Sequence, residues 1–279
     1  MKNLCKTGID ALKEVPWGTH VCLLYEAEAD LLEVLVPYMR AGLEQGEFCL
    51  WITAGSAQRE AVQTKLRDAV PDLARHGARG NLELVDQHDW YYAPDGTLDL
   101  DAAGKKSKRI LKDRLSKGLT GMRMAGSGHW RSRAEWEALM AYEQGINQSI
   151  TRVPVVTVCC YPLGRCGPCE IAEVVSTHQH ALVRRSGHWT MVENAEHRLV
   201  QKRVEESEKN YRRIFETAAN LITSVNNDGV IVDCNRRILD VLGYEQEEIL
   251  GQNMSVIIHP DYHEKAGRSL AEILEKGFL

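Results

Sequence analysis

Residues 153–161 read Val-Pro-Val-Val-Thr-Val-Cys-Cys-Tyr. A run this apolar, with β-branched residues at most positions, is typical of a strand that is buried on both faces of a sheet. Such a strand requires helices on both sides of the sheet. The run is also only about half of the roughly 20 residues that a membrane-spanning helix needs. It therefore predicts a three-layer α/β domain and no membrane span.

On either side of this run, short apolar stretches alternate with longer amphipathic ones. Strands are predicted at 20–25, 47–52, 82–85, 122–125 and 153–161, and helices at 30–44, 56–70, 101–117, 133–148 and 169–182. A short strand is expected after Gly187, closing the unit near Val192. Strict alternation of this kind indicates βαβ units and a parallel sheet. We therefore assign residues 1–192 to one domain.

Several short motifs are distributed along this domain. They are Gly18-Thr19-His20, Leu24-Tyr25, Gly42-Leu43 with Gly46-Glu47, Trp90, Ala141-Tyr142-Glu143 and Cys160-Tyr161-Pro162-Leu163. In these residues the domain resembles the MEDS domain, the methanogen and methylotroph sensory domain of a dichloromethane-responsive regulator and of many sensor histidine kinases. The resemblance implies a fold related to RecA-type ATPases and a sensory role.

The loop after the first predicted strand differs from that of an ATPase. A RecA-type ATPase carries G-x-x-x-x-G-K-[ST] here, because backbone N–H groups and a lysine hold the phosphates. Residues 25–30 read Tyr-Glu-Ala-Glu-Ala-Asp, with neither glycine nor lysine and with three carboxylates that repel a triphosphate. We expect the fold to serve as a binding scaffold.

Residues 193–215 are almost entirely charged and polar and contain no proline or glycine, which predicts a single linker helix. Its narrow apolar stripe consists of Leu199, Val200, Val204, Tyr211, Ile214 and Phe215. Two copies can bury such a stripe as a short coiled coil. A homodimer through this helix is one prediction, and a solvated linker is the other.

The remaining segment, residues 208–279, carries a second set of motifs in a fixed order. They are a hairpin turn at Asn227-Asp228-Gly229, an asparagine at the hairpin exit (Asn235), Leu242-Gly243-Tyr244, Ile249-Leu250-Gly251 and His259-Pro260-Asp261. In this order they resemble the first part of an α+β PAS domain. Because a PAS fold ends with three further antiparallel strands, we expect this domain to be truncated and the chain to be a fragment of a longer protein.

Aromatic and polar side chains follow the ends of the predicted strands: Tyr25, Trp90, His129, Trp130 and Tyr161. Ligands of open α/β sheets bind outside the carboxyl ends of the strands. These residues therefore form the predicted site for a small, partly apolar organic ligand. The alternative is that the two tryptophans only cover the end of the sheet. No catalytic residue is predicted, and the sequence leaves the cofactor open.

The motif Cys-Gly-Pro-Cys at residues 166–169 lies between a strand and a helix, as in thioredoxins, where the helix N-terminus lowers the pKa of the first thiol. Cys166 and Cys169 therefore suggest a redox switch, or a thiol–disulfide oxidoreductase, as an alternative function. Too few residues follow the motif to complete a thioredoxin domain. The first interpretation is that these thiols pack as small apolar groups.

A metal site is not predicted from these cysteines. Cys169 and His178 lie about 13 Å apart along the predicted helix, so they cannot share one ion. The trio Cys160, Cys166 and Cys169 would still need a fourth ligand, such as His20 or His129.

The 279 residues include 39 acidic and 34 basic side chains, so no electrostatic case for nucleic-acid binding arises. Residues 1–16 contain no apolar signal region, which assigns the eight cysteines to a reducing cytoplasm. The chain is therefore predicted to be the sensory input region of a cytoplasmic signalling protein with a downstream kinase or other output domain. A sensor histidine kinase is the first interpretation, by analogy with the family alone, and a transcriptional regulator is the alternative.

Overall fold

The computed structural model describes residues 4–128, 130–151 and 153–276, and the chain divides between Arg198 and Leu199 into two compact units. The first unit contains β1 (Leu4–Lys6), β2 (Glu14–Pro16), β3 (His20–Tyr25), α1 (Glu28–Glu44), β4 (Phe48–Thr53), α2 (Ser56–Ala69), α3 (Leu73–Ala78), β5 (Leu82–Asp86), α4 (Gln87–Tyr91), α5 (Leu100–Ser116), β6 (Met122–Ser127), α6 (Arg133–Ile150), β7 (Val155–Pro162), α7 (Pro168–Thr177), β8 (His180–Arg185) and β9 (His188–Glu193).

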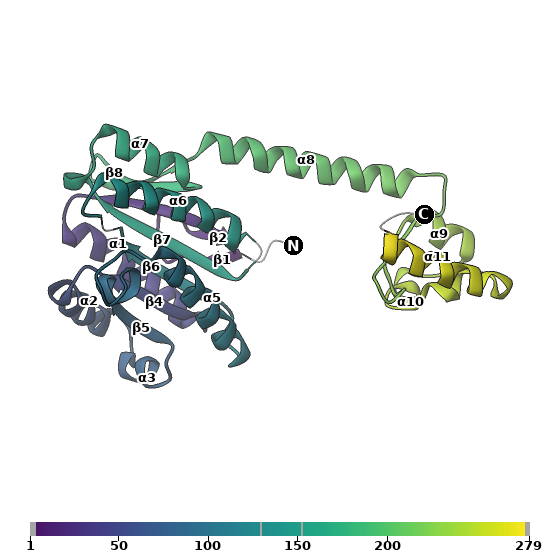
Figure 1. Cartoon of the computed structure of the whole chain (residues 1–279), viewed down its shortest axis with the longest axis horizontal. Helices are drawn as coiled ribbons and strands as arrows, with labels where there is room; N and C mark the ends of the chain where they lie inside the picture. The colour runs from purple at the N-terminus through teal and green to yellow at the C-terminus, as the bar shows by residue number, and fades with distance from the viewer. Residues whose placement is uncertain (1–3, 129, 152, 277–279) are drawn as a thin grey trace. The chain divides into compact units, whose positions relative to one another are not determined.

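Seven strands of this unit form one sheet in the order β5-β4-β6-β7-β3-β8-β9 (Figure 1). All neighbouring pairs are parallel except β8 and β9. Helices α1 and α2 pack on one face of the sheet, and α5, α6 and α7 pack on the other. The predicted three-layer α/β domain is confirmed. In the described part of the chain, no helix combines the length and the apolar character needed to cross a membrane.

Strand β7 is the centre of the sheet, as its sequence predicts. Val158 and Cys160 join the core under α1 and α2, whereas Cys159 and Tyr161 join the core under α6 and α7. Successive residues of one strand therefore belong to different cores. This alternation decides which cysteine of the Cys159-Cys160 pair meets which helices.

The helix predicted at 169–182 is wrong in its second half. Helix α7 ends at Thr177, and the chain continues from His180 as strand β8, which pairs with β3. The turn into β9 passes through Ser186 and Gly187, both with positive φ, which suits a tight two-residue hairpin. The open edge of β3 offers a ladder of hydrogen bonds, and this tertiary pairing outweighs the local helical pattern.

Arg123 of β6 is fully buried, and every one of its five N–H donors is used. Two bonds, of 2.7 and 2.9 Å, go to the two carboxylate oxygens of Glu47. The other three go to the backbone carbonyls of Lys6, Thr7 and Tyr38, at 2.7–3.0 Å. One guanidinium therefore joins the N-terminal hairpin, α1, the start of β4 and β6.

Two motifs that carry the family resemblance surround this guanidinium. Glu47 provides its counter-charge, and Gly42 provides its space. A Cβ atom on Gly42 would lie 2.8 Å from Arg123 Nε and 2.7 Å from Cys49 Sγ. Only glycine allows α1 to approach the buried arginine this closely.

The start of α1 binds a carboxylate of the chain itself. The Asp30 side chain accepts hydrogen bonds from the backbone N–H groups of Glu26 (3.2 Å) and Ala27 (3.0 Å). Arg184 of β8 pairs with the same carboxylate. Backbone N–H groups that hold phosphate in a P-loop therefore already have an anionic partner here.

The second unit contains the end of α8 (Ala195–Thr217), followed by β10 (Thr223–Val225), β11 (Ile231–Cys234), α9 (Arg236–Leu242), α10 (Gln246–Ile249) and α11 (His263–Lys276). Strands β10 and β11 form the predicted antiparallel hairpin. The motif residue Asn235 is buried and donates to the carbonyls of Phe215 and Asn220, while its oxygen accepts from the N–H of Ile222. This asparagine ties the end of α8 to the hairpin.

The stripe predicted on the linker helix divides into two parts. Phe215 is buried in the second unit, whereas Leu199, Tyr211 and Ile214 are exposed. The side chains of Val200 and Val204 lie outside the described residues. The coiled coil stays a prediction.

We expect the substitution Glu47→Gln to lower the free energy of unfolding by about 3–5 kcal/mol, because it leaves the buried Arg123 charge uncompensated. Urea unfolding monitored by tryptophan fluorescence measures this, since all six tryptophans lie in the first unit. The matched control is Glu44→Gln, which breaks the exposed pair with Arg40. That change should cost less than about 1 kcal/mol. Equal effects of the two substitutions would contradict the role given to Arg123.

Candidate functional site

The residues predicted to form a ligand site are distributed over several parts of the domain. Tyr25 packs against the core under α1 and α2. Trp130 and Tyr161 belong to the core under α6 and α7, and Trp90 belongs to the core under α5. His129 lies outside the described residues. The prediction that these residues share one ligand stays untested.

Two of these aromatic side chains are buried, and a third is partly covered by its neighbours. Trp90 is 3% exposed and Tyr161 is fully buried. The partly buried Trp130 ring lies 4.7 Å from the ring of Trp136, and the Arg165 guanidinium lies 4.7 Å from its centroid. These contacts favour the alternative interpretation, in which the tryptophans cover the sheet.

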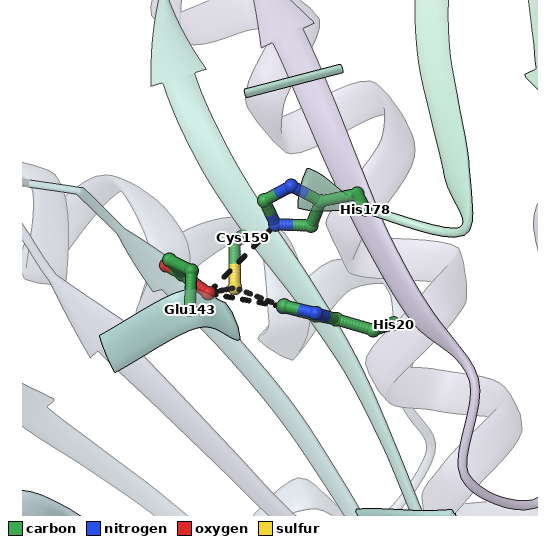
Figure 2. A group of neighbouring side chains, drawn as sticks. All are labelled: His20, Glu143, Cys159 and His178. Atoms are coloured by element: carbon green, nitrogen blue, oxygen red, sulfur yellow. Dashed lines mark hydrogen bonds and ion pairs between the residues drawn. The ribbon is translucent and has the colours of Figure 1, made fainter. Parts of the chain in front are cut away.

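A different set of polar side chains converges between the sheet and helices α6 and α7 (Figure 2). It consists of His20, Glu143, Cys159 and His178, which we call the buried cluster. Their exposed fractions are 0%, 4%, 8% and 0%. His20 begins β3, Glu143 lies in α6, Cys159 lies in β7, and His178 follows α7. One nitrogen, oxygen or sulfur atom from each lies within 4.8 Å of those of the other three.

The Glu143 carboxylate is at the centre of the cluster. Its Oε2 atom lies 3.0 Å from His20 Nε2, 3.3 Å from Cys159 Sγ and 3.8 Å from His178 Nε2. Its Oε1 atom accepts a 2.8 Å hydrogen bond from the Tyr161 hydroxyl. The tyrosine therefore fixes the carboxylate plane and directs Oε2 at the other three groups.

Oxygen acceptors outside the cluster orient both imidazole rings. His178 Nδ1 lies 2.7 Å from the carbonyl oxygen of Val174, and His20 Nδ1 lies 2.9 Å from Asn147 Oδ1. The Asn147 amide nitrogen donates to the carbonyl of Thr177, which leaves Asn147 Oδ1 as the acceptor for His20. Both rings thus carry their proton on Nδ1 when neutral, and both present Nε2 to Glu143.

Burial and charge shape the protonation of the cluster. Burial by itself raises the pKa of Glu143, but the hydrogen bond with His20 and the neighbouring imidazoles and Tyr161 lower it to about 2. Burial, reinforced by Glu143, raises the pKa of the Cys159 thiol well above its usual range. A catalytic cysteine requires the opposite shift and an open approach for substrate. The cluster therefore has the composition of a ligand set for a cation and not of a nucleophilic site.

Sequence reasoning missed this cluster, although signals for it exist. Trp136, Leu139, Met140 and Glu143 follow one another at helical spacing on the buried face of α6, and the last of them is charged. His20 likewise opens a strand whose next four residues are buried and apolar. A charged or titratable residue at a core position marks a functional or structural polar site.

A cavity of about 1020 Å³ lies on the same face of the sheet, between α5 and α6. Its apolar lining includes Leu98, Leu111, Leu115, Met122, Met124, Ile146, Ile150, Val153 and Val155, with hydroxyl groups from Tyr142 and Thr157. Thr157 Oγ1 also lies 4.0 Å from Cys159 Sγ of the buried cluster. The cavity is larger than most small-molecule sites and resembles them in its apolar lining.

The Cys-Gly-Pro-Cys motif has no feature of an activated thiol. Cys166 is partly buried and Cys169 is exposed, and both are free cysteines. Burial, together with Glu170, raises the pKa of Cys166, whereas a redox-active first thiol requires a lowered pKa. Cys160 faces the opposite side of the sheet from Cys159, in the core under α1 and α2.

Known proteins match both parts of the chain. The family model described as MEDS, the methanogen/methylotroph, DcmR sensory domain, matches residues 19–179, and a model of the PAS fold matches residues 209–278. The predicted order of the two domains is confirmed.

The transcriptional repressor DcmR of Methylorubrum extorquens is 24% identical over 190 residues, which cover 64% of this chain and 64% of the repressor. The match thus spans less than two thirds of the repressor's length. The crystal structure of the KaiC-like protein PH0186 from Pyrococcus horikoshii OT3 superposes with a TM-score of 0.45 at 15% identity, covering 68% of this chain and 86% of that one.

We expect Trp90→Ala to destabilise the first unit by about 3–5 kcal/mol, the cost of truncating a buried tryptophan. Its ring packs in the core under α5 and lies beneath the Lys106 ammonium group, 4.4 Å from the ring centroid. Urea unfolding monitored by the remaining tryptophans measures the change. If the free energy of unfolding fell by less than about 1 kcal/mol, a structural role for Trp90 would be contradicted and its role in the predicted ligand site would be favoured.

Proposed function

Because this chain belongs to the MEDS family and a PAS domain follows its MEDS domain, we propose that it is the sensory input region of a signal-transduction protein. The signal in this proposal is a small, mainly apolar organic molecule. Its binding site is the cavity between α5 and α6. The mainly apolar lining of this cavity is the observation that supports the proposal.

The cavity provides both affinity and selectivity for such a ligand. Leu115 is 37% exposed and Leu98 and Ile146 are half-buried, so a ligand that covers them removes apolar surface from water. Tyr142 and Thr157 provide hydroxyl groups that can orient one polar group of the ligand. The lining also includes charged side chains of α5 and its N-cap, namely Asp99, Asp101, Lys105, Lys108 and Lys112.

Of the predicted ligand set, the described residues Tyr25, Trp90, Trp130 and Tyr161 are absent from the lining of this cavity, and His129 lies outside the described residues. Binding at the carboxyl edge of the sheet is therefore a separate proposal. The enclosed positions of Trp90 and Tyr161 make it the weaker one.

The signal passes, in this proposal, through α8 into the PAS domain. Helix α8 is continuous from Ala195 to Thr217, and Asn235 fastens its end to the first hairpin of the PAS domain. A homodimer through α8 would bury the exposed side chains of Leu199 and Ile214. A cytoplasmic location is part of the same proposal and agrees with eight free cysteines.

Two output classes belong to this proposal. The resemblance to MEDS domains in front of sensor histidine kinases suggests a kinase, and the similarity to the transcriptional repressor DcmR supports a regulator of transcription. Autophosphorylation of a histidine with ATP would distinguish the first class from the second.

The ligand proposal is tested with dichloromethane, n-butanol and benzene as probes, measured by thermal shift and by NMR of the 279-residue chain. We expect at least one probe to stabilise the protein. Gly145 lines the cavity and has open space around it, so Gly145→Leu should fill part of the cavity and weaken binding of that probe at least about tenfold.

The matched control is Gly77→Leu, at a helical glycine in α3 that also has open space around it and does not line the cavity. It should leave probe binding unchanged. The proposal is wrong if none of the three probes binds, or if Gly145→Leu binds a probe as tightly as Gly77→Leu does.

A further inference from the structure

We propose that the buried cluster of His20, Glu143, Cys159 and His178 binds one divalent transition-metal ion, with zinc as the best fit to the donor set. The inference rests on the geometry of these four residues and their immediate neighbours. It does not depend on the ligand, the cavity or the output of the proposed function.

The distances within the cluster match a tetrahedral site. Zinc bonds of about 2.0–2.3 Å at tetrahedral angles place the donor atoms about 3.3–3.6 Å apart. The observed separations from Glu143 Oε2 are 3.0, 3.3 and 3.8 Å, and His20 Nε2 lies 3.2 Å from Cys159 Sγ. The two remaining donor pairs, both of His178 Nε2, lie within 4.8 Å, so the His178 ring has to move by up to about 1 Å toward the other three donors to complete the tetrahedron.

The surroundings of the imidazoles are those of metal ligands. Metal-bound histidines characteristically donate their second ring N–H to a carbonyl or carboxylate, which fixes the tautomer and the ring orientation. Here the carbonyl of Val174 and the amide oxygen of Asn147 perform this role for His178 and His20. In both rings Nε2 then faces Glu143 Oε2, at 3.0 Å for His20 and 3.8 Å for His178.

The charges also favour a divalent cation. With both rings neutral, their Nε2 lone pairs and the ionised carboxylate face one another in a site closed to water, and a proton on His20 Nε2 or a divalent cation between them relieves the repulsion. When the ion binds, the Cys159 thiol releases its proton to solvent and a metal–sulfur bond forms. The ion, the thiolate and the Glu143 carboxylate then sum to zero charge, and a neutral site can be buried at low cost.

The donor set decides the class of ion. Two imidazoles, one thiolate and one carboxylate suit zinc or another late first-row divalent ion, and not calcium or magnesium, which prefer oxygen. Four protein donors complete a tetrahedron and leave no open position for a substrate. We therefore infer a site that fastens β3, β7, α6 and α7 to one another and not a catalytic centre.

The test uses the purified 279-residue chain, stripped with a chelator and titrated with Co²⁺ as a spectroscopic substitute for zinc. We expect one Co²⁺ per chain, with visible d–d bands of tetrahedral intensity and a sulfur-to-cobalt charge-transfer band in the near ultraviolet. Added Zn²⁺ should remove these bands, because its filled d shell has no such transitions. Metal removal should lower the melting temperature, and Zn²⁺ should restore it.

Cysteine substitutions identify the sulfur. Cys159→Ser should abolish the charge-transfer band. Two controls should retain it: Cys160→Ser, at the neighbouring buried thiol on the opposite face, and the double substitution of Cys166 and Cys169 by serine. Loss of the band in either control and not in Cys159→Ser would overturn the assignment.

A positioning residue gives a finer test. Asn147→Ala removes the acceptor of His20 Nδ1 and leaves all four donors in place. Its affinity for Zn²⁺ should fall about 10- to 100-fold, while the charge-transfer band of the Co²⁺ form remains.

X-ray absorption of the zinc-loaded wild-type chain keeps the proposal testable if a variant fails to fold. One sulfur and three nitrogen or oxygen neighbours are expected at the ion. Failure of the stripped chain to bind Co²⁺ or Zn²⁺, or a first shell without sulfur, would refute the site.

Discussion

The buried pair of Arg123 and Glu47 is the constraint on which the first domain depends. The two residues are 76 positions apart in the chain and form a bidentate contact between the starts of two neighbouring strands. The guanidinium uses its remaining N–H groups on backbone carbonyls, so all five of its own donors have a partner. A charge this deep is tolerated only when it is fully paired. The N-terminal hairpin and α1 must therefore close over it, which explains the glycine at position 42.

The opposite face of the same sheet contains the second polar group of the core, the buried cluster. Strand β7 contributes side chains to both faces, because Cys159 lies in the core under α6 and α7 while Cys160 lies in the core under α1 and α2. Each face thus combines an apolar core with one polar group linking elements that are distant in sequence. Such groups specify which helices pack where, since an apolar contact could form in several registers. On the cluster face, a bound ion would add this specificity without leaving a net charge inside.

The loop between β3 and α1 lacks the glycines and the lysine of a P-loop. Asp30 takes the backbone N–H groups at the start of α1, and Arg184 neutralises it from β8. The ligand site that we propose lies between α5 and α6, where Met122, Met124 and Thr157 of the sheet line a cavity. Thr157 lines this cavity, and its hydroxyl lies 4.0 Å from Cys159 Sγ of the buried cluster. The cavity and the buried cluster therefore adjoin the same strand, β7. Function on this scaffold is thus a property of side chains and not of the fold.

The sequence alone determined the sheet, the order of the two domains and the absence of a P-loop motif. The apolar run at 155–162 and the motifs around Asn235 involve only residues that are neighbours in the chain. Such patterns can be recognised from the sequence of a single segment. The extent of α7 was mispredicted, because the pairing of β8 with β3 depends on an edge that lies over 150 residues away in the chain. The same limit applies to the buried cluster. His20, Glu143, Cys159 and His178 lie on four elements that only the packing of the sheet and its helices brings within 4.8 Å. The sequence supplied the chemical groups, and the tertiary structure decided that they face one another, because their meeting point is set by strand order and helix packing and not by spacing along the chain.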